Sequence, residues 1–234
     1  MKAFSWNKAG TGLAWSNMTS VSLAVREAKT DKWVVRHQLP QPKVCRHKLS
    51  TASILSTHHS NCQVACLSWS PGGTHLATWE QYAVIQGQQP QPNLHLWNTE
   101  TGEKVKSFFQ KKMSGWCPQW SSDEKICSRI VNNEVQFYED NSFQVIKHKI
   151  HMSKVSNYSM AHGSSKSLHV VTYVPGAKGA PCFTKMYQYP NFDDNQVIAN
   201  KSFFQADSVE YKWNNQGTTV LLLTQSDVDK TGAS

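Results

Sequence analysis

The sequence predicts an all-β protein built from repeated four-stranded sheets. Three observations point to this fold: short runs in which apolar and polar residues alternate, polar turns between these runs, and a motif that returns along the chain. No long amphipathic helical pattern interrupts them. The motif consists of a strand, a polar turn and a second strand, and it reads FSWNKAGTGLAW at residues 4–15 and LSWSPGGTHLATW at residues 67–79.

Three further copies of the motif follow. They read PQWSSDEKIC at residues 118–127, SMAHGSSKSL at 159–168 and YKWNNQGTTV at 211–220. Each copy carries one marker residue close to its turn, and these markers are Trp6, Trp69, Trp120, His162 (in place of a tryptophan) and Trp213. Their separations are 63, 51, 42 and 51 positions, and all but the first lie near the roughly 40 to 50 residues of a four-stranded propeller blade. The repeat therefore predicts a β-propeller.

Outer strands complete the predicted blades. Three of the hairpins are followed by a second pair of strands, at residues 93–98 and 103–109, 135–138 and 143–147, and 183–189 and 197–204. Blades begin near Lys2, Ala65, Trp116 and Val155, and a fifth begins at Ser208 but reaches only two strands. We predict one domain over residues 1–234, a partial ring of about four and a half four-stranded blades, truncated in its fifth blade and belonging to a longer protein. The alternative is a five-bladed ring that closes with a partial last blade.

Residues 45–64 do not fit the repeat, since they show neither strand alternation nor a turn pattern. Without them the first separation between markers shrinks from 63 to 43 positions. One hypothesis is a zinc site, because thiols and imidazoles are zinc ligands and this region holds Cys45, His47, His58, His59, Cys62 and Cys66. Their spacing matches no common zinc pattern, so we expect an off-pattern insertion or a translated intron, and no bound metal.

Composition and charge favour a protein with an anionic partner and argue against a membrane or secreted protein. The 24 Lys and Arg residues outnumber the 16 Asp and Glu residues, which gives a formal net charge of +8 and favours an anionic partner such as RNA. The longest uninterrupted apolar run, residues 220–223, is far shorter than the roughly 20 residues that cross a bilayer, and no secretory signal follows Met1. We therefore expect a cytoplasmic protein with no membrane contact, whose six cysteines remain thiols.

Lysines recur at positions that a propeller places on one face. In a blade, the turn between the second and third strands and the connection to the next blade share that face. The lysines on this face, at positions 111, 112, 154, 178 and 230, would pair with phosphates. The neighbouring aromatic residues Phe109, Trp116 and Tyr173 would stack on bases, as RNA binding requires. Taken singly, each lysine is better explained as a solvated surface charge, and Phe109 and Trp116 are better explained as core residues; only their convergence on one face favours a binding site. The predicted RNA- or ribosome-binding set is Lys111, Lys112, Trp116, Lys154, Lys178 and Lys230.

The sequence offers no catalytic motif. Enzymatic chemistry calls for a nucleophile with a base and an orienting group, or for paired carboxylates in a cleft, and here the acidic residues are scattered singly. For His162 we expect a structural role beside its turn. We therefore predict a protein that is not an enzyme and uses no cofactor.

Several ordered strings resemble those of one family. They are LATW at residues 76–79, PNLHLW at 92–97, KSFFQKKM at 106–113 and WCPQW at 116–120, and the likeness continues through YVPGAKGAP at 173–181, ANKSFF at 199–204 and DVDKTGAS at 227–234. The chain resembles the eukaryotic translation initiation factor 2A family over nearly all residues outside 45–64. The general Trp-Asp signature of WD repeats survives only as Trp97-Asn98.

The resemblance implies both a fold and a function. It implies a WD-repeat-like propeller, followed in the family by a C-terminal extension. It further implies binding to the small ribosomal subunit and GTP-independent delivery of initiator methionyl-tRNA, with mRNA and other initiation proteins open as further partners. The alternative is a WD-repeat protein-interaction scaffold without direct RNA binding, because a propeller fold by itself does not fix a function.

Overall fold

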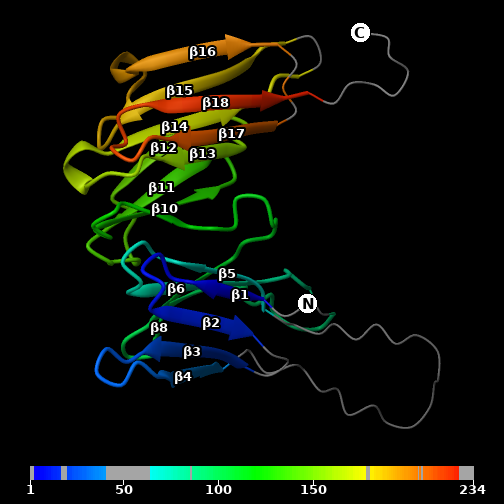
Figure 1. Ribbon diagram of the computed structural model, residues 1–234. Helices are drawn as coiled ribbons and strands as arrows, with labels where there is room; N and C mark the ends of the chain where they lie inside the picture. Colours follow the sequence, from blue (N-terminus) through cyan, green and yellow to red (C-terminus); the bar gives the residue numbers. More distant parts are fainter. Residues whose placement is uncertain are drawn as a thin grey trace. The chain divides into compact units, whose positions relative to one another are not determined.

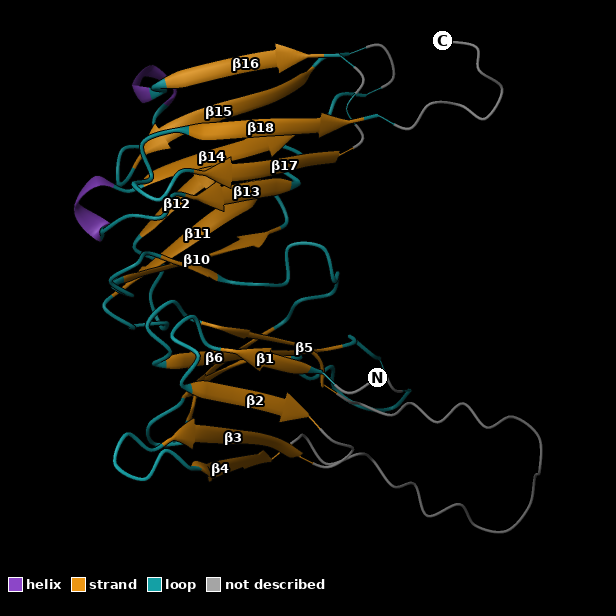
Figure 2. Ribbon diagram, viewed as in Figure 1, coloured by secondary structure: helices purple, strands orange, loops and turns teal. Residues whose placement is uncertain are grey.

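The computed structural model describes residues 3–16, 20–40, 64–84, 86–177, 180–204, 206 and 208–226. Antiparallel strands dominate these residues, and the only helical segments among them are two short 3-10 helices, η1 (Ser165–Ser167) and η2 (Asp194–Gln196) (Figure 2). Within the described parts of the chain, no helix is long and apolar enough to cross a membrane.

The strands form four four-stranded sheets and one two-stranded sheet, each in sequence order (Figure 1). The first sheet holds β1 (Phe4–Trp6), β2 (Gly12–Ser16), β3 (Ser20–Arg26) and β4 (Trp33–Pro40). The second holds β5 (Val64–Trp69), β6 (His75–Glu80), β7 (Leu94–Asn98) and β8 (Lys104–Phe108). The third holds β9 (Gln119–Trp120), β10 (Ile126–Val131), β11 (Glu134–Glu139) and β12 (His148–His151). The fourth holds β13 (Asn157–Met160), β14 (His169–Val174), β15 (Cys182–Gln188) and β16 (Ala199–Phe203), and the fifth holds β17 (Ser208–Trp213) and β18 (Val220–Gln225). The predicted four and a half blades are confirmed.

The chain divides into two compact units, Met1–Ser114 with the first two sheets and Gly115–Ser234 with the other three. The single domain over residues 1–234 stays a prediction. The predicted insertion at residues 45–64 lies outside the described residues except for Val64, which is the first residue of β5.

One turn geometry recurs in four of the five inner hairpins and explains the repeated motif. In the second sheet, Ser70 N donates to His75 O, Gly73 N donates to Ser70 O, and the Ser70 hydroxyl accepts from His75 N at 2.9 Å. Gly73 has a φ of +79°, a left-handed conformation that glycine adopts at little cost. Asn7, Ser121 and Asn214 occupy the position of Ser70 and make the same backbone bonds.

The same bonding pattern corrects the fourth marker. Ala161 N donates to His169 O, so Ala161 takes the place of Ser70, and the residue before it, Met160, takes the place of the marker tryptophan. Met160 is buried, whereas His162 is exposed in a turn lengthened by η1. The prediction that His162 replaces the tryptophan was therefore wrong by two positions, and an adaptable thioether fills the site of the indole.

The partner of β11 also differs from its prediction, which placed a strand at residues 143–147. Asp140 and Asn141 both have positive φ and lead into a longer turn, in which Phe143 is buried beside Tyr138 with ring centroids 6.0 Å apart. The strand then forms at β12, where Ile150 pairs with Val135. Phe143 is thus a buried residue of the turn. The alternation pattern alone does not distinguish a turn with one buried apolar residue from a strand.

Apolar side chains between neighbouring sheets make up the core of each unit. In the first unit the cluster is Ala14, Val21, Leu23, Leu39, Val64, Leu76 and Trp97. In the second unit, one cluster joins the third and fourth sheets around Val135, Phe137, Ile150, Leu168, Val170 and Tyr187, and another joins the fourth and fifth around Tyr173, Cys182, Ala206 and Val209.

Two marker indoles link one sheet to the next. Trp69 Nε1 donates to Ser5 O at 3.0 Å, and Trp213 Nε1 donates to Ser159 Oγ at 2.9 Å. Ser5 and Ser159 both immediately precede a marker, so the two bonds occupy equivalent places in the repeat. Trp69 and Trp213 therefore share one kind of environment, whereas Trp6 is 51% exposed and Trp120 is buried.

Candidate nucleic-acid interface

Antiparallel pairing gives each sheet two ends, and the sequence places the predicted binding residues at one of them. We call this the connection end: it carries the β2–β3 type of turn and the connections between sheets. The opposite end, with the β1–β2 and β3–β4 types of turn, is the hairpin end. Lys111 and Lys112 lie in the connection after β8 in the first unit, while Trp116 and Lys154 lie at connection ends in the second unit. Lys178 and Lys230 lie outside the described residues.

The backbone that carries Lys111 and Lys112 is fixed by buried hydrogen bonds. Gln110 N donates to Asn93 Oδ1 at 2.8 Å, and Asn93 Nδ2 donates back to Gln110 O at 2.8 Å. Trp79 Nε1 donates to the same Gln110 carbonyl at 3.0 Å, and Gln110 Nε2 donates to Lys112 O at 3.0 Å. Because these hydrogen bonds are buried, the backbone that carries the two lysines is held in one conformation.

Aromatic side chains surround these lysines. Lys111 Nζ lies 5.5 Å from the ring centroid of Tyr82, within the range of a cation–π contact, and Tyr82 packs edge-on against Phe109 at 6.4 Å. Phe109 and Met113 are 49% and 61% exposed. We call Tyr82, Phe109, Lys111, Lys112 and Met113 the lysine–aromatic cluster.

Sequence reasoning missed Tyr82. It lies in the long β6–β7 connection, among glutamine, proline and glycine residues that form no motif. A single aromatic residue in such a loop indicates a contact site, because an exposed ring adds little stability to a surface loop unless it packs against another group. Only the structure brings that ring to Lys111.

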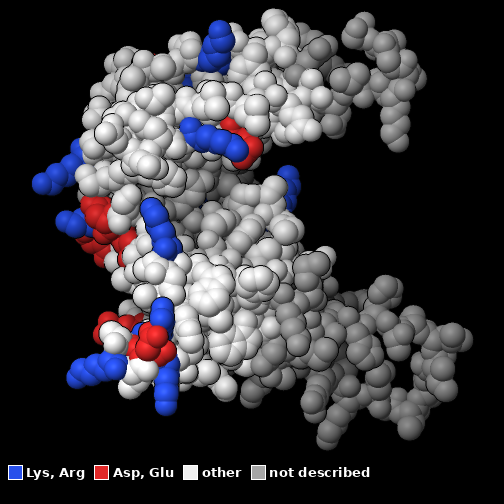
Figure 3. All heavy atoms as spheres, viewed as in Figure 1, with Lys and Arg blue, Asp and Glu red and all other residues white. Residues whose placement is uncertain are grey.

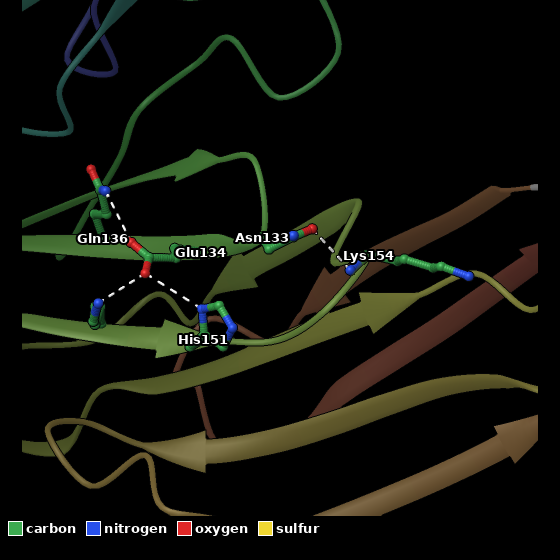
Figure 4. A network of polar contacts seen from close by, with 6 residues as sticks. Asn133, Glu134, Gln136, His151 and Lys154 are labelled. Carbon is green, nitrogen blue, oxygen red and sulfur yellow. Dashed lines mark hydrogen bonds and ion pairs between the residues drawn. The ribbon is translucent and has the colours of Figure 1, made fainter.

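In the second unit, a side-chain amide holds the turn that carries Lys154. Lys154 has a φ of +62°, and its backbone N donates to Asn133 Oδ1 at 3.0 Å (Figure 4). Its side chain extends away from the neighbouring polar network in the same view. Trp116 is half-buried.

The carboxylate of Glu134, the residue after Asn133, is already engaged. Glu134 accepts from Lys149 Nζ at 2.9 Å and from Gln136 Nε2 at 3.3 Å, and His151 Nδ1 lies 3.4 Å from it (Figure 4). The bond from Lys149, followed by that from Gln136, holds the pKa of Glu134 below its ordinary value. Lys154 therefore presents its ammonium group without neutralisation by this acid.

Tyr173 does not interleave with the lysines as expected. It is only 3% exposed, its ring stacks on Phe203, and its hydroxyl donates to Ala206 O at 2.7 Å. A ring held between two sheets cannot stack a base, so the expectation for Tyr173 was wrong.

Acidic side chains are absent from the described loops of the connection end in each unit. In the first unit these are residues 81–84, 86–93 and 109–114, and in the second 115–118, 132–133, 152–156, 175–177 and 180–181. The described turns of the hairpin end, in contrast, hold Glu27, Asp31, Glu100, Glu103, Asp123, Glu124, Asp140, Asp193 and Asp194. Several acidic side chains lie directly beside lysines or arginines in the space-filling view (Figure 3). A polyanion would therefore meet lysines without carboxylates in the same loop at the connection end, whereas at the hairpin end it would do so only at the described turns with Lys8 and Lys166.

Other kinds of site find no support among the described residues. No group of three or more His, Cys, Asp or Glu side chains there is placed to hold a metal ion. Five of the six candidate zinc ligands lie outside the described residues, and the sixth, Cys66, is a free thiol. Cys117, Cys127 and Cys182 form no disulfide with another described residue.

Comparisons with known proteins bear on the family. Residues 201–234 match the family described as Eukaryotic translation initiation factor eIF2A. The chain is 41% identical over 174 residues to Eukaryotic translation initiation factor 2A of Drosophila melanogaster, an alignment that covers 72% of this chain and 27% of that protein. The chain spans less than a third of the length of the curated relatives it matches.

Solved structures bear on the fold. A structure described as the crystal structure of the eukaryotic initiation factor matches with a TM-score of 0.76 and 31% identity, covering 95% of this chain and 49% of that one. The C-terminal WD40 domain of Sif2 matches with a TM-score of 0.57 and 16% identity, covering 95% of this chain and 54% of that one. The second likeness shows the fold alone, and the predicted WD-repeat-like propeller is confirmed. Sequence strings, sheet architecture and these likenesses agree that the chain belongs to the eukaryotic translation initiation factor 2A family, of which it represents one part.

Proposed function

We propose that this chain is part of a cytoplasmic translation initiation factor that binds RNA of the small ribosomal subunit through its connection ends. The observation that carries the proposal is the lysine–aromatic cluster on loops that hold no acidic residue. The names of the matching relatives support translation initiation as the process. GTP-independent delivery of initiator methionyl-tRNA is the step that we propose it serves. Messenger RNA and other initiation proteins are further proposed partners.

The proposed contact with RNA combines lysine–phosphate pairs with stacking of aromatic rings on bases. Lys111 and Lys112 would pair with phosphates and release counterions, which makes the affinity depend on salt. Phe109 and Tyr82 would stack on unpaired bases, worth about 1–3 kcal/mol per base and tolerant of sequence. Lys154 and Trp116, with Lys178 and Lys230, would add contacts from the second unit. The chain would thus follow an RNA surface without reading a defined sequence.

Replacing both cluster lysines tests the proposal. For Lys111→Ala/Lys112→Ala in the full chain we expect about tenfold weaker binding to small ribosomal subunits near 100 mM salt. The slope of log affinity against log salt should become shallower by about 1.5, because each lost phosphate contact removes about 0.7–0.9. Co-sedimentation or fluorescence titration from 50 to 200 mM salt measures both quantities.

A matched pair at the hairpin end is the control. Lys29→Ala/Lys32→Ala removes the same charge from turns that contain acids, and it should leave the salt slope unchanged. An unchanged slope in the Lys111→Ala/Lys112→Ala variant would exclude phosphate contacts at the cluster and favour the alternative of a scaffold without direct RNA binding.

A further inference from the structure

The outer strand of the first sheet, β4, has an open edge. β4 is last in the order β1-β2-β3-β4, and no other strand of the described residues pairs with it (Figure 1). At eight residues it is longer than the outer strands β8, β12 and β16, which have five, four and five. Long edge strands are templates for pairing with another chain, and proteins usually keep them short or protected.

The register shows which backbone groups face outward. Arg26 N donates to Thr11 O, on the β2 side of β3, so the pair Arg26 and Trp33 does not exchange hydrogen bonds. Bonding pairs alternate along an antiparallel ladder, so Val34 bonds to Val25 while the N–H and C=O groups of Trp33 and Val35 point away from β3. These groups match the spacing of an added strand.

A pocket of about 440 Å³ lies at the hairpin-end side of this edge. Its lining combines apolar residues (Val25, Ala28, Val34), three cationic residues (Arg26, Lys29, Arg36), Thr30 and one acidic residue, Glu27. A carboxylate on a short side chain suits this mixture, because the cations supply charge-assisted hydrogen bonds and the apolar floor takes the methylene groups.

The acids of the same hairpin are already occupied. Asp31 pairs with Arg26 at 2.6 Å, and Glu27 accepts from the Thr30 hydroxyl at 2.9 Å. Lys29 and Arg36 remain as cations for an incoming group. The hairpin end also carries Glu100, whose carbonyl lies 2.7 Å from His37 Nε2, and Glu103. These acids disfavour a long polyanion such as RNA but leave room for a single carboxylate.

We propose that β4 binds an extended segment of a partner protein as a fifth strand, with an Asp or Glu side chain of that segment in the pocket beside Lys29 and Arg36. Successive side chains of an added strand alternate between the two faces of the sheet. Apolar residues would contact Trp33 and Val35, which are 43% and 49% exposed, and acidic residues would enter the pocket on the other face. Recognition of this kind is β-strand addition, in which backbone hydrogen bonds hold the segment and one acidic side chain in the pocket adds specificity.

An eight-residue fluorescein-labelled peptide of alternating Val and Glu probes the site by fluorescence polarisation with the full chain. We expect saturable binding that weakens at least tenfold in Arg36→Glu, because a repelling carboxylate then lines the pocket. Lys32→Glu makes the same charge change in the same hairpin outside the pocket lining, and it should shift the affinity by no more than about twofold. Lys29→Glu gives the pocket test again should Arg36→Glu lose its fold by circular dichroism.

Two further peptides separate strand addition from charge attraction. The same peptide, methylated at those alternate backbone nitrogens that would face β4, cannot donate to the carbonyl groups of Trp33 and Val35, so its binding should be lost. The peptide of alternating Val and Lys should not bind. Equal affinity of the methylated peptide, no effect of the pocket variants, or displacement by an equimolar uridine octanucleotide would each overturn the proposal, the last in favour of a nucleic-acid site.

Discussion

Phe137→Ala is expected to lower the free energy of unfolding of the second unit by about 3–5 kcal/mol, the cost of removing a buried aromatic ring and leaving a cavity. Phe137 is fully buried. Its ring stacks on Phe192 at 4.8 Å and lies 5.5 Å from the ring of Tyr189. Since these rings belong to the third and fourth sheets, the cavity opens at the contact between two sheets. Urea unfolding followed by intrinsic fluorescence measures the change.

Phe204→Ala is the matched control, because it deletes the same side chain at a site that is 70% exposed. Its expected effect is within about 0.5 kcal/mol. Equal effects of the two substitutions would contradict the packing of sheet on sheet that defines the propeller.

Glu80→Gln is expected to stabilise the first unit at alkaline pH. Glu80 is 4% exposed, and its Oε1 atom has no hydrogen-bond partner within the described residues. Burial raises its pKa to about 7 from an ordinary value of 4.5, against a smaller opposing effect of Lys104. The folded chain therefore holds this proton more tightly than the unfolded chain, so stability is lost as pH rises through about 7. The amide cannot ionise and escapes this loss.

The expected gain is about 3 kcal/mol at pH 8.5, where Glu80 is ionised in both states, and less than about 1 kcal/mol at pH 5, just above the ordinary pKa of 4.5, where ionisation of the unfolded state has only begun to count. Urea midpoints of wild type and variant at the two pH values check it. Glu100→Gln, in an exposed turn of the same sheet, should show no such difference between the two pH values. A gain that is as large at pH 5 as at pH 8.5 would show that ionisation of Glu80 does not limit stability.

A second buried group titrates in the opposite sense. Burial, followed by Lys104, lowers the pKa of His95 to about 4, so the folded state keeps this imidazole neutral. His95 therefore costs stability as pH falls from about 6.5 to about 4, a range that overlaps the one between about 4.5 and 7 in which Glu80 acts. Comparing wild type with Glu80→Gln at each pH cancels this contribution.

The repeat could be predicted from the sequence because four of the five inner hairpins need a polar residue followed, three positions later, by one with positive φ. Ser70 with Gly73 and Asn214 with Gly217 both meet this need. The prediction failed in the fourth copy of the motif, residues 159–168, because its turn is longer. His162 therefore lies in the sequence near the position expected for the tryptophan. Which side chain is buried there depends on the hydrogen bond from Ala161 to His169, which spans eight positions and leaves no local signal.

The candidate site could be predicted only in part. Strand order fixes where the connections lie, so the position of Lys111, Lys112 and Lys154 at the connection end could be predicted, while their contact with RNA stays a prediction. Tyr82 was missed because its contact with Lys111 joins loops from two different connections. Tyr173 was misjudged because strand alternation does not say which face of a sheet is covered. Contacts between sheets decide such details, and these lie far apart in the sequence.

Hydrogen exchange of the full chain, with and without small ribosomal subunits, tests most directly whether the connection end faces RNA. The account predicts slower exchange in residues 86–93 and 109–114 on binding, and no change in the hairpin-end turns at residues 27–32 and 99–103. Protection of those hairpin-end turns with no change at residues 109–114 would contradict it.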